Sequence, residues 1–254
     1  MADEQRRARY LEALGIEQWV RRASPAAEPP SIAESLATAE SPTSAKAPVG
    51  ATSPTSRMGP AASVGALDWP ALRACVSECQ RCGLHQTRTQ TVFGVGDMAA
   101  HWMVVGEAPG AEEDRQGEPF VGAAGQLLNA MLAAIHLPRE SVFIANILKC
   151  RPPDNRDPKP DEVAECLPYL HRQVSLVQPR IILAFGRVAA QNLLGTDTPL
   201  GKLRGSVHRF GALNTPVVVT YHPAYLLRSP GEKRKAWEDL KFARRIYSEL
   251  TVGA

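Results

Sequence analysis

The folded part of the chain is marked by short apolar runs that alternate with longer stretches of helical periodicity, from residue 67 to the C-terminus. Four runs predict buried strands, at residues 102–105, 142–147, 180–185 and 216–220. Four stretches predict helices, at residues 123–135, 161–177, 187–194 and 232–250. Strands that alternate with helices are typical of an α/β domain with a parallel sheet covered on both faces. We therefore predict one α/β domain over residues 67–254.

The N-terminal quarter follows a different pattern. Residues 1–23 place Leu11, Leu14 and Trp19 near one face of a predicted amphipathic helix. Residues 24–66 consist mainly of Ala, Ser, Pro and Thr, with almost no large apolar side chains. A segment of that composition cannot bury enough surface to offset the entropy of ordering it. We therefore predict a disordered linker between the amphipathic segment and the folded domain.

Composition narrows the class of protein only slightly. The chain is 44% hydrophobic and 22% charged, as is usual for a globular protein, and its net charge of +3 permits a polyanionic partner without demanding one. No apolar run approaches the roughly 18 residues that span a bilayer, and the N-terminus lacks the apolar stretch of a secretory signal. We therefore expect a cytoplasmic protein with no membrane partner.

Five cysteines carry the clearest chemical signal: Cys75, Cys79, Cys82, Cys150 and Cys166. An odd number without an export signal argues against a disulfide framework. Cys79 and Cys82 form a C-x2-C pair, and with Cys150 and Cys166 they supply four soft ligands from two distant parts of the chain. Four thiolates suit an iron–sulfur cluster or a structural zinc, and the plainer alternative is four inert core cysteines. Cys75 is left over, although it could replace Cys79 as a ligand.

Three predicted strands run directly into unusual segments: GEAPG at 106–110, KCRPPDNR at 149–156 and YHPAYLLR at 221–228. Because the carboxyl ends of parallel strands meet at one edge of a sheet, we expect these segments to form the functional loops. The first is rich in glycine but lacks the G-x-x-x-x-G-K-[ST] pattern, and no basic residue stands at its end. A nucleotide-hydrolysing phosphate loop is therefore disfavoured.

Three side chains near these loops are candidates for binding a planar ligand. Phe120, between Pro119 and Val121, either presents a stacking ring or packs in the core. Asn146 lies in the apolar run VFIANIL, where an amide is costly unless it caps local backbone or pairs with a ligand. His222 precedes a proline at a strand end, a position suited to site chemistry or to a structural role in the turn.

The motifs occur in a characteristic order: C-x2-C-x-L at Cys79, TRTQTVFGVGD at Thr87, GEAPGAEED at Gly106, GEPFVG at Gly117, KCRPPDNRDP at Lys149, Cys166, and YHPAYLLR at Tyr221. Together they resemble family 4 uracil-DNA glycosylases across residues 70–247. The resemblance implies an α/β/α sandwich with a central four-stranded parallel sheet. It also implies one 4Fe–4S cluster held by Cys79, Cys82, Cys150 and Cys166.

The resemblance further implies that the enzyme flips uracil out of DNA and hydrolyses its bond to the sugar, leaving an abasic site in base excision repair. Phe120 would stack on uracil and His222 would polarise it, while the backbone at Gly106 and Ala108 would contact the base. Asn146 would read the N3–H and O4 edge, where cytosine presents a mismatched acceptor and donor.

The residue that activates water is left open among Glu107, Glu113 and Asn155, because Ala108 stands where related families place an aspartate. A covalent histidine mechanism is disfavoured, since the chain lacks the KRRIH-type insertion that carries it.

Contacts with DNA are expected next to the histidine loop. Leu226 and Leu227 could provide an apolar wedge and Arg228 a phosphate-binding cation, although a leucine pair more often belongs to the core.

We expect a monomer that acts on single- or double-stranded uracil-containing DNA in the bacterial nucleoid. The amphipathic segment would dock on its own domain or, slightly favoured, on a replication or repair protein. A non-catalytic DNA-binding module braced by a cluster is the alternative function.

Overall fold

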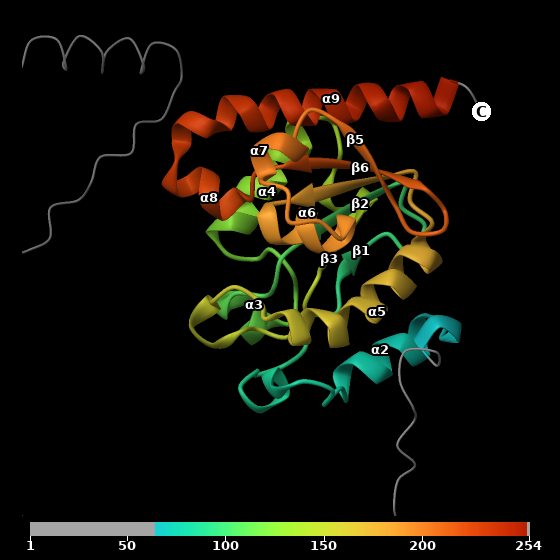
Figure 1. Ribbon diagram of the computed structural model, residues 1–254, viewed down its shortest axis with the longest axis vertical. Helices are drawn as coiled ribbons and strands as arrows, with labels where there is room; N and C mark the ends of the chain where they lie inside the picture. Colours follow the sequence, from blue (N-terminus) through green and yellow to red (C-terminus); the bar gives the residue numbers. More distant parts are fainter. Residues whose placement is uncertain (1–63, 253–254) are drawn as a thin grey trace, which may run out of the picture. The chain divides into compact units, whose positions relative to one another are not determined.

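One mixed sheet forms the centre of the computed structural model, which describes residues 64–252 (Figure 1). Its six strands run in the order β1-β3-β2-β4-β6-β5. They are β1 Val95–Gly96, β2 Trp102–Gly106, β3 Val142–Asn146, β4 Ile181–Phe185, β5 Val207–Phe210 and β6 Thr215–Thr220. The inner four pair in parallel and coincide with the four predicted strands, whereas β1 and β5 are antiparallel edge strands.

The expectation of a four-stranded sheet was therefore wrong in strand number. β1 has only two residues, too few to show any periodicity in the sequence. In β5 three of the four residues are partly or fully exposed, and no apolar run announces the strand.

The helices include the four that the sequence predicts, here α4 Ala123–Ala134, α5 Pro160–Val177, α6 Arg187–Leu194 and α9 Lys233–Val252. Residues 64–252 contain four further helices: α2 Trp69–Ser77, α3 Ala111–Gln116, α7 Leu200–Leu203 and α8 Pro223–Arg228. Short 3-10 turns occupy η1 Val64–Ala66, η2 Gly83–Gln86, η3 Arg139–Ser141, η4 Pro153–Asn155 and η5 Pro230–Glu232. The predicted loop segment YHPAYLLR thus contains a helix, with Pro223 in its first turn.

Both faces of the sheet are covered. Met103 and Val105 of β2 belong to a core shared with α2, α5 and α6. Trp102 and Val104 point to the opposite face and belong to a second core, shared with α4, α8 and α9. In Figure 1, α9 lies along one side of the sheet and α5 with α2 along the other. The domain is therefore an α/β fold with helix layers on both faces.

Helix α5 links the two functional regions described below. Pro160 stands at its start, where a missing N–H costs nothing, and Glu162 accepts a hydrogen bond from the Lys159 N–H at 2.9 Å. Its buried face carries Cys166 and Gln173, which are two helical turns apart.

The first described residues pack against the folded domain. Val64 is only 2% exposed and belongs to the core. The amphipathic segment 1–23 and the linker up to residue 63 lie outside the described residues. Within residues 64–252 no helix has the length and apolar character needed to cross a membrane.

Candidate active site

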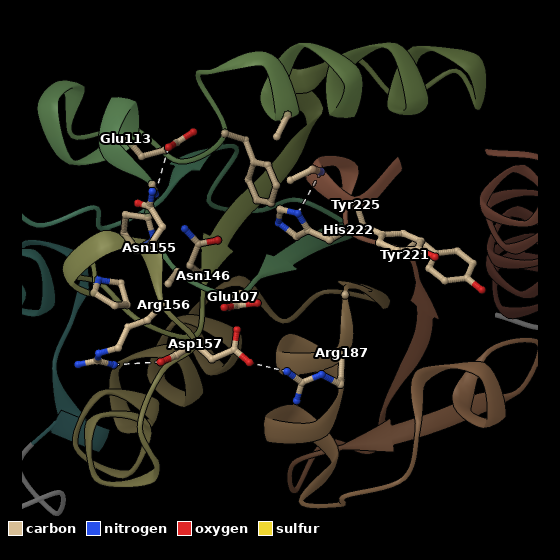
Figure 2. A pocket seen from close by; sticks show the side chains of 18 of the residues that line it. Glu107, Glu113, Asn146, Asn155, Arg156, Asp157, Arg187, Tyr221, His222 and Tyr225 are labelled. Atoms are coloured by element: carbon tan, nitrogen blue, oxygen red, sulfur yellow. Dashed lines mark hydrogen bonds and ion pairs between the residues drawn. The ribbon is translucent and has the colours of Figure 1, made fainter. Parts of the chain in front are cut away.

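A cleft of about 670 Å³ opens at the carboxyl ends of the four parallel strands. Each strand end contributes to its wall: Glu107 after β2, Asn146 at the end of β3, Arg187 after β4 and His222 after β6. Figure 2 shows Asn146, Glu107 and His222 grouped around this cleft. The predicted convergence of the strand-end loops is confirmed.

Asn146 is the central polar group of the cleft. It is 2% exposed, and its Oδ1 atom has no hydrogen-bond partner among residues 64–252. The side chain therefore does not cap local backbone through this oxygen, which was the alternative open from the sequence. A buried acceptor without a partner is costly, so this atom is suited to a ligand that donates a hydrogen bond.

Gly106 makes room for that amide. It pairs with Asn146 across β2 and β3, and a Cβ atom at Gly106 would lie 2.4 Å from Asn146 Oδ1 and 2.6 Å from Phe120 Cζ. Any larger residue would therefore collide with two cleft side chains.

Phe120 and His222 form a stacked pair in the wall of the cleft. Their ring centroids are 5.5 Å apart and their planes differ by 29°. Phe120 is both a core residue, 6% exposed, and a cleft-lining residue. Its backbone adopts a left-handed φ of 55°, which is unusual for a bulky side chain and is typical of functional sites.

The protonation state of His222 follows from its position at the start of α8. Its Nδ1 atom accepts a hydrogen bond from the Ala224 N–H at 3.2 Å. Burial, assisted by the Arg228 guanidinium, lowers the pKa of His222 to about 4. The imidazole is therefore neutral near pH 7, and with Nδ1 acting as acceptor the proton is on Nε2.

Glu107 lies in the same cleft but in a different environment. Burial and the nearby Asp157 carboxylate raise its pKa to about 7, and the Arg187 guanidinium opposes this rise. Its carboxylate makes no hydrogen bond with residues 64–252. A carboxyl group with a pKa near neutrality is suited to accept a proton.

Glu113 does not have that freedom. Its Oε2 accepts a hydrogen bond from Gly110 N–H at 3.1 Å, and its Oε1 accepts from the N–H groups of Val121 and Gly122 at 3.0 and 3.4 Å. Both oxygens thus brace the GEAPG segment against the Phe120 loop. This engagement argues against Glu113 as the water-activating base and assigns it a structural role.

Asn155 lines the cleft from the KCRPPDNR segment. It has a φ of 53°, and its Oδ1 accepts a hydrogen bond from Arg151 Nε at 2.8 Å. The same segment is anchored to α5 by the paired hydrogen bonds of Arg156 with Glu162. Asn155 is thereby held at the rim with its amide nitrogen available.

Comparison with known proteins decides the family of this site. Residues 93–241 match the model of the Uracil DNA glycosylase superfamily. The chain belongs to this superfamily. It is 47% identical over 173 residues to a type-4 uracil-DNA glycosylase of Archaeoglobus fulgidus, covering 65% of this chain and 86% of the relative.

Two further relatives support the same branch of the uracil-DNA glycosylase superfamily. The type-4 uracil-DNA glycosylase of Pyrobaculum aerophilum is 42% identical over 180 residues, covering 68% of this chain and 92% of the relative. That of Thermotoga maritima is 40% identical over 173 residues, covering 66% and 89%. The resemblance to family 4 is confirmed.

The three residues expected to contact DNA differ in their exposure. Leu226 is 1% exposed and packs in the core with α4 and α9, so its expected role as a wedge is corrected to core packing. Successive side chains of a helix point in different directions, and Leu227 is accordingly 44% exposed. Arg228 lines the cleft.

Sequence reasoning missed several residues of the cleft wall. Arg187 pairs with Asp157 at 2.5 Å, and Tyr221 stacks on Tyr225 with ring centroids 5.3 Å apart. Arg187 follows β4 directly, so the strand-end rule that located Asn146 and His222 would have found it too.

The cysteines line a second cavity, separate from the cleft. Cys79, Cys82, Cys150 and Cys166 share it with Arg81, Arg88, Lys149 and Tyr169. Cys75 is not among its lining residues, and its Sγ lies 3.8 Å from the Tyr169 hydroxyl. Four thiols around one cavity fit the donor set of an iron–sulfur cluster.

Two hydrogen-bond donors point at these sulfurs. Arg88 Nη1 donates to Cys150 Sγ at 3.1 Å, and the Lys149 N–H donates to Cys166 Sγ at 3.2 Å. Burial raises the pKa of Cys166 to about 12, so this thiol ionises at neutral pH only when a metal replaces its proton. In the described part of the chain no three His, Cys, Asp or Glu residues are arranged to hold a metal ion.

Proposed function

We propose that this protein excises uracil from DNA by hydrolysing the N-glycosidic bond of a nucleotide flipped into the cleft. The observation that carries the proposal is the buried Oδ1 of Asn146, which has no hydrogen-bond partner among residues 64–252 and lines a cleft beside the stacked Phe120 and His222 rings. An amide there accepts the N3–H of uracil and donates to its O4. Cytosine presents an acceptor and an amino donor at these positions, so it leaves both amide groups mismatched.

His222 would stabilise the leaving group. As the glycosidic bond breaks, negative charge develops on the uracil O2, and the Nε2–H of a neutral imidazole can donate a hydrogen bond to it. The acceptor role of Nδ1 at the start of α8 keeps the proton on Nε2. Phe120, stacked on His222, supplies the flat surface against which the base lies.

Glu107 is our candidate for activating water, because its raised pKa lets it take a proton near pH 7. Asn155 lines the same cleft and would orient that water with its amide nitrogen. The backbone at Gly106 and Ala108 would contact the base directly, since the glycine and the small alanine allow close approach.

We further propose that Cys79, Cys82, Cys150 and Cys166 hold one 4Fe–4S cluster. When bound, the cluster supplies a covalent cross-link between residues 79–82 and the segment from residue 150 to α5. Arg88 and the Lys149 N–H already point at two of the sulfurs, as donors to cluster ligands do. The chain's own part is to brace the KCRPPDNR segment that forms one wall of the cleft.

DNA would be held at the mouth of the cleft by Arg228 and by the exposed Leu227, with the protein acting as a monomer on the DNA of the nucleoid. The N-terminal segment would tether the enzyme to a replication or repair protein.

Single-turnover release of free base from labelled oligonucleotides tests the proposed function. We expect release from a uracil-containing strand and none from the matched cytosine strand. Binding of both strands without any release would show the non-catalytic DNA-binding module instead.

A further inference from the structure

Lys149 is fully buried although it carries an ammonium group; its side chain is 1% exposed. It lies three residues after Asn146 and immediately before Cys150, between the cleft and the cysteine cavity. A buried ammonium is costly unless its donors are paired, so this position calls for a physical reason.

The hydrogen bonds of Lys149 reach both sites. Its Nζ donates to the backbone carbonyl of Asn146 at 2.8 Å and to Gln173 Oε1 at 2.7 Å. Its backbone N–H donates to Cys166 Sγ at 3.2 Å, and its carbonyl accepts from the Val92 N–H at 2.8 Å. One residue therefore contacts the base-reading strand end, the cysteine cavity and the intervening helix α5.

These contacts fix the backbone of Asn146 from two sides. The Ile147 N–H donates to the Gly106 carbonyl at 3.0 Å, and Lys149 Nζ holds the Asn146 carbonyl. The peptide after Asn146 cannot rotate without breaking one of these bonds. The side-chain Oδ1 of Asn146 has no hydrogen-bond partner among residues 64–252.

Helix α5 completes the link. It carries Cys166, which accepts from the Lys149 backbone, and Gln173, which accepts from the Lys149 side chain. Gln173 Nε2 in turn donates to the Phe93 carbonyl at 2.8 Å, so its amide is fixed at both ends. Thiolates in the neighbouring cavity would offset the charge of the ammonium.

We propose that Lys149 is a positioning residue that couples the cysteine cavity to the base-reading amide of Asn146. This inference rests on the proposed function, because it concerns how uracil is recognised. Lys149 does not touch the base; it acts by holding the strand end from which Asn146 reads it. Its loss should therefore weaken discrimination at the N3 edge more than it weakens binding in general.

The test compares inhibition of the full-length enzyme by free uracil and by 3-methyluracil, which lacks the N3–H. Lys149→Met keeps an unbranched apolar side chain as far as the ε position but removes the terminal donor. We expect its inhibition constant for uracil to rise about tenfold and that for 3-methyluracil to stay nearly constant, so the ratio of the 3-methyluracil constant to the uracil constant falls. Gln173→Met is the matched control, since it disturbs the same buried network but leaves the bond from Lys149 to Asn146. Its ratio should stay within about twofold of the parent.

The ratio decides the outcome whatever the iron content of the variants. A parent-like ratio in Lys149→Met, or an equal fall in Gln173→Met, would overturn the inference while excision by the parent protein still upheld the proposed function. No uracil release by the parent protein would instead overturn the proposed function itself. If Lys149→Met does not fold, Lys149→Gln replaces it in the test, because the Gln donor is one atom too short to reach the Asn146 carbonyl. We expect Lys149→Gln to lower the ratio at least about threefold, and an unchanged ratio would contradict the inference.

Discussion

Gly106 and Asn146 face each other at the carboxyl ends of β2 and β3, and a Cβ atom on Gly106 would lie 2.4 Å from the amide oxygen of Asn146. The absence of a side chain at Gly106 thus leaves the room that the Asn146 amide occupies in the cleft. This relationship makes Gly106 as necessary to the site as any polar group.

Gly106→Ala should therefore impair uracil excision severely. The added methyl group must displace both Asn146 and Phe120, and overpacking of this kind costs about 1–3 kcal/mol. We expect the single-turnover rate to fall by about 100-fold or more and the melting temperature to fall by a few degrees. Gly231→Ala, where no atom lies within 4 Å of the added Cβ and φ is not positive, as at Gly106, is the matched control. A parent-like rate in Gly106→Ala would contradict the crowding.

Glu107 predicts a specific pH dependence. If its ionised form activates water, the pseudo-first-order rate rises with pH and levels off above about 7, because burial raises its pKa to that value. Glu107→Gln should lower the rate and abolish the rise. A pH profile unchanged in shape in Glu107→Gln would show that Glu107 is not the base.

The same carboxyl group predicts a stability effect of known sign. Its folded-state pKa of about 7 lies above its usual value of 4.5, so its contribution to stability is fully present below pH 4.5 and is lost as the pH rises through 7. Glu107→Gln should match the parent in melting temperature near pH 4.5 and exceed it at pH 8. An equal difference at both pH values would show that Glu107 is not buried as described.

The cysteines predict a contrast between two otherwise similar substitutions. Cys150→Ser should lose iron, the brown colour and much of the folded yield, because Cys150 lines the cavity shared with three other cysteines. Cys75→Ser should keep all three properties, since Cys75 is not among the lining residues. Absorbance near 400 nm, iron content and thermal melting measure the difference. A colourless but stable and active Cys150→Ser enzyme would rule out an iron–sulfur cluster that serves as a structural cross-link.

Much of the fold was predictable because the inner strands are continuous apolar runs and the long helices repeat their apolar positions. The short elements were not. α3 has the sequence AEEDRQ, without apolar periodicity, and is held by tertiary bonds such as those of Asp114 to the Thr89 N–H at 2.9 and 3.0 Å. α8 lies in a segment expected to form a loop, and its helical turn decides between the DNA wedge and the core packing that the sequence left open for Leu226.

The candidate site, like the fold, was predictable only in part. Asn146 and His222 were found because parallel strands bring their carboxyl ends together. The commitment of both Glu113 oxygens to backbone N–H groups could not be read from the sequence, since it depends on loops that only the fold brings into contact. The unpartnered oxygen of Asn146 is likewise a property of the packed structure.

The central claim is that the Asn146 amide reads uracil, and Asn146→Asp tests it most directly. The substitution keeps the shape of the side chain and replaces its one donor with an acceptor, so excision should weaken by roughly a few kcal/mol while the fold survives. The decisive measurement is the single-turnover rate of uracil release by Asn146→Asp, alongside its melting temperature. The account predicts a rate at least about 100-fold below the parent in a protein that melts normally. An unchanged rate in a properly folded variant would contradict it and remove Asn146 from the site.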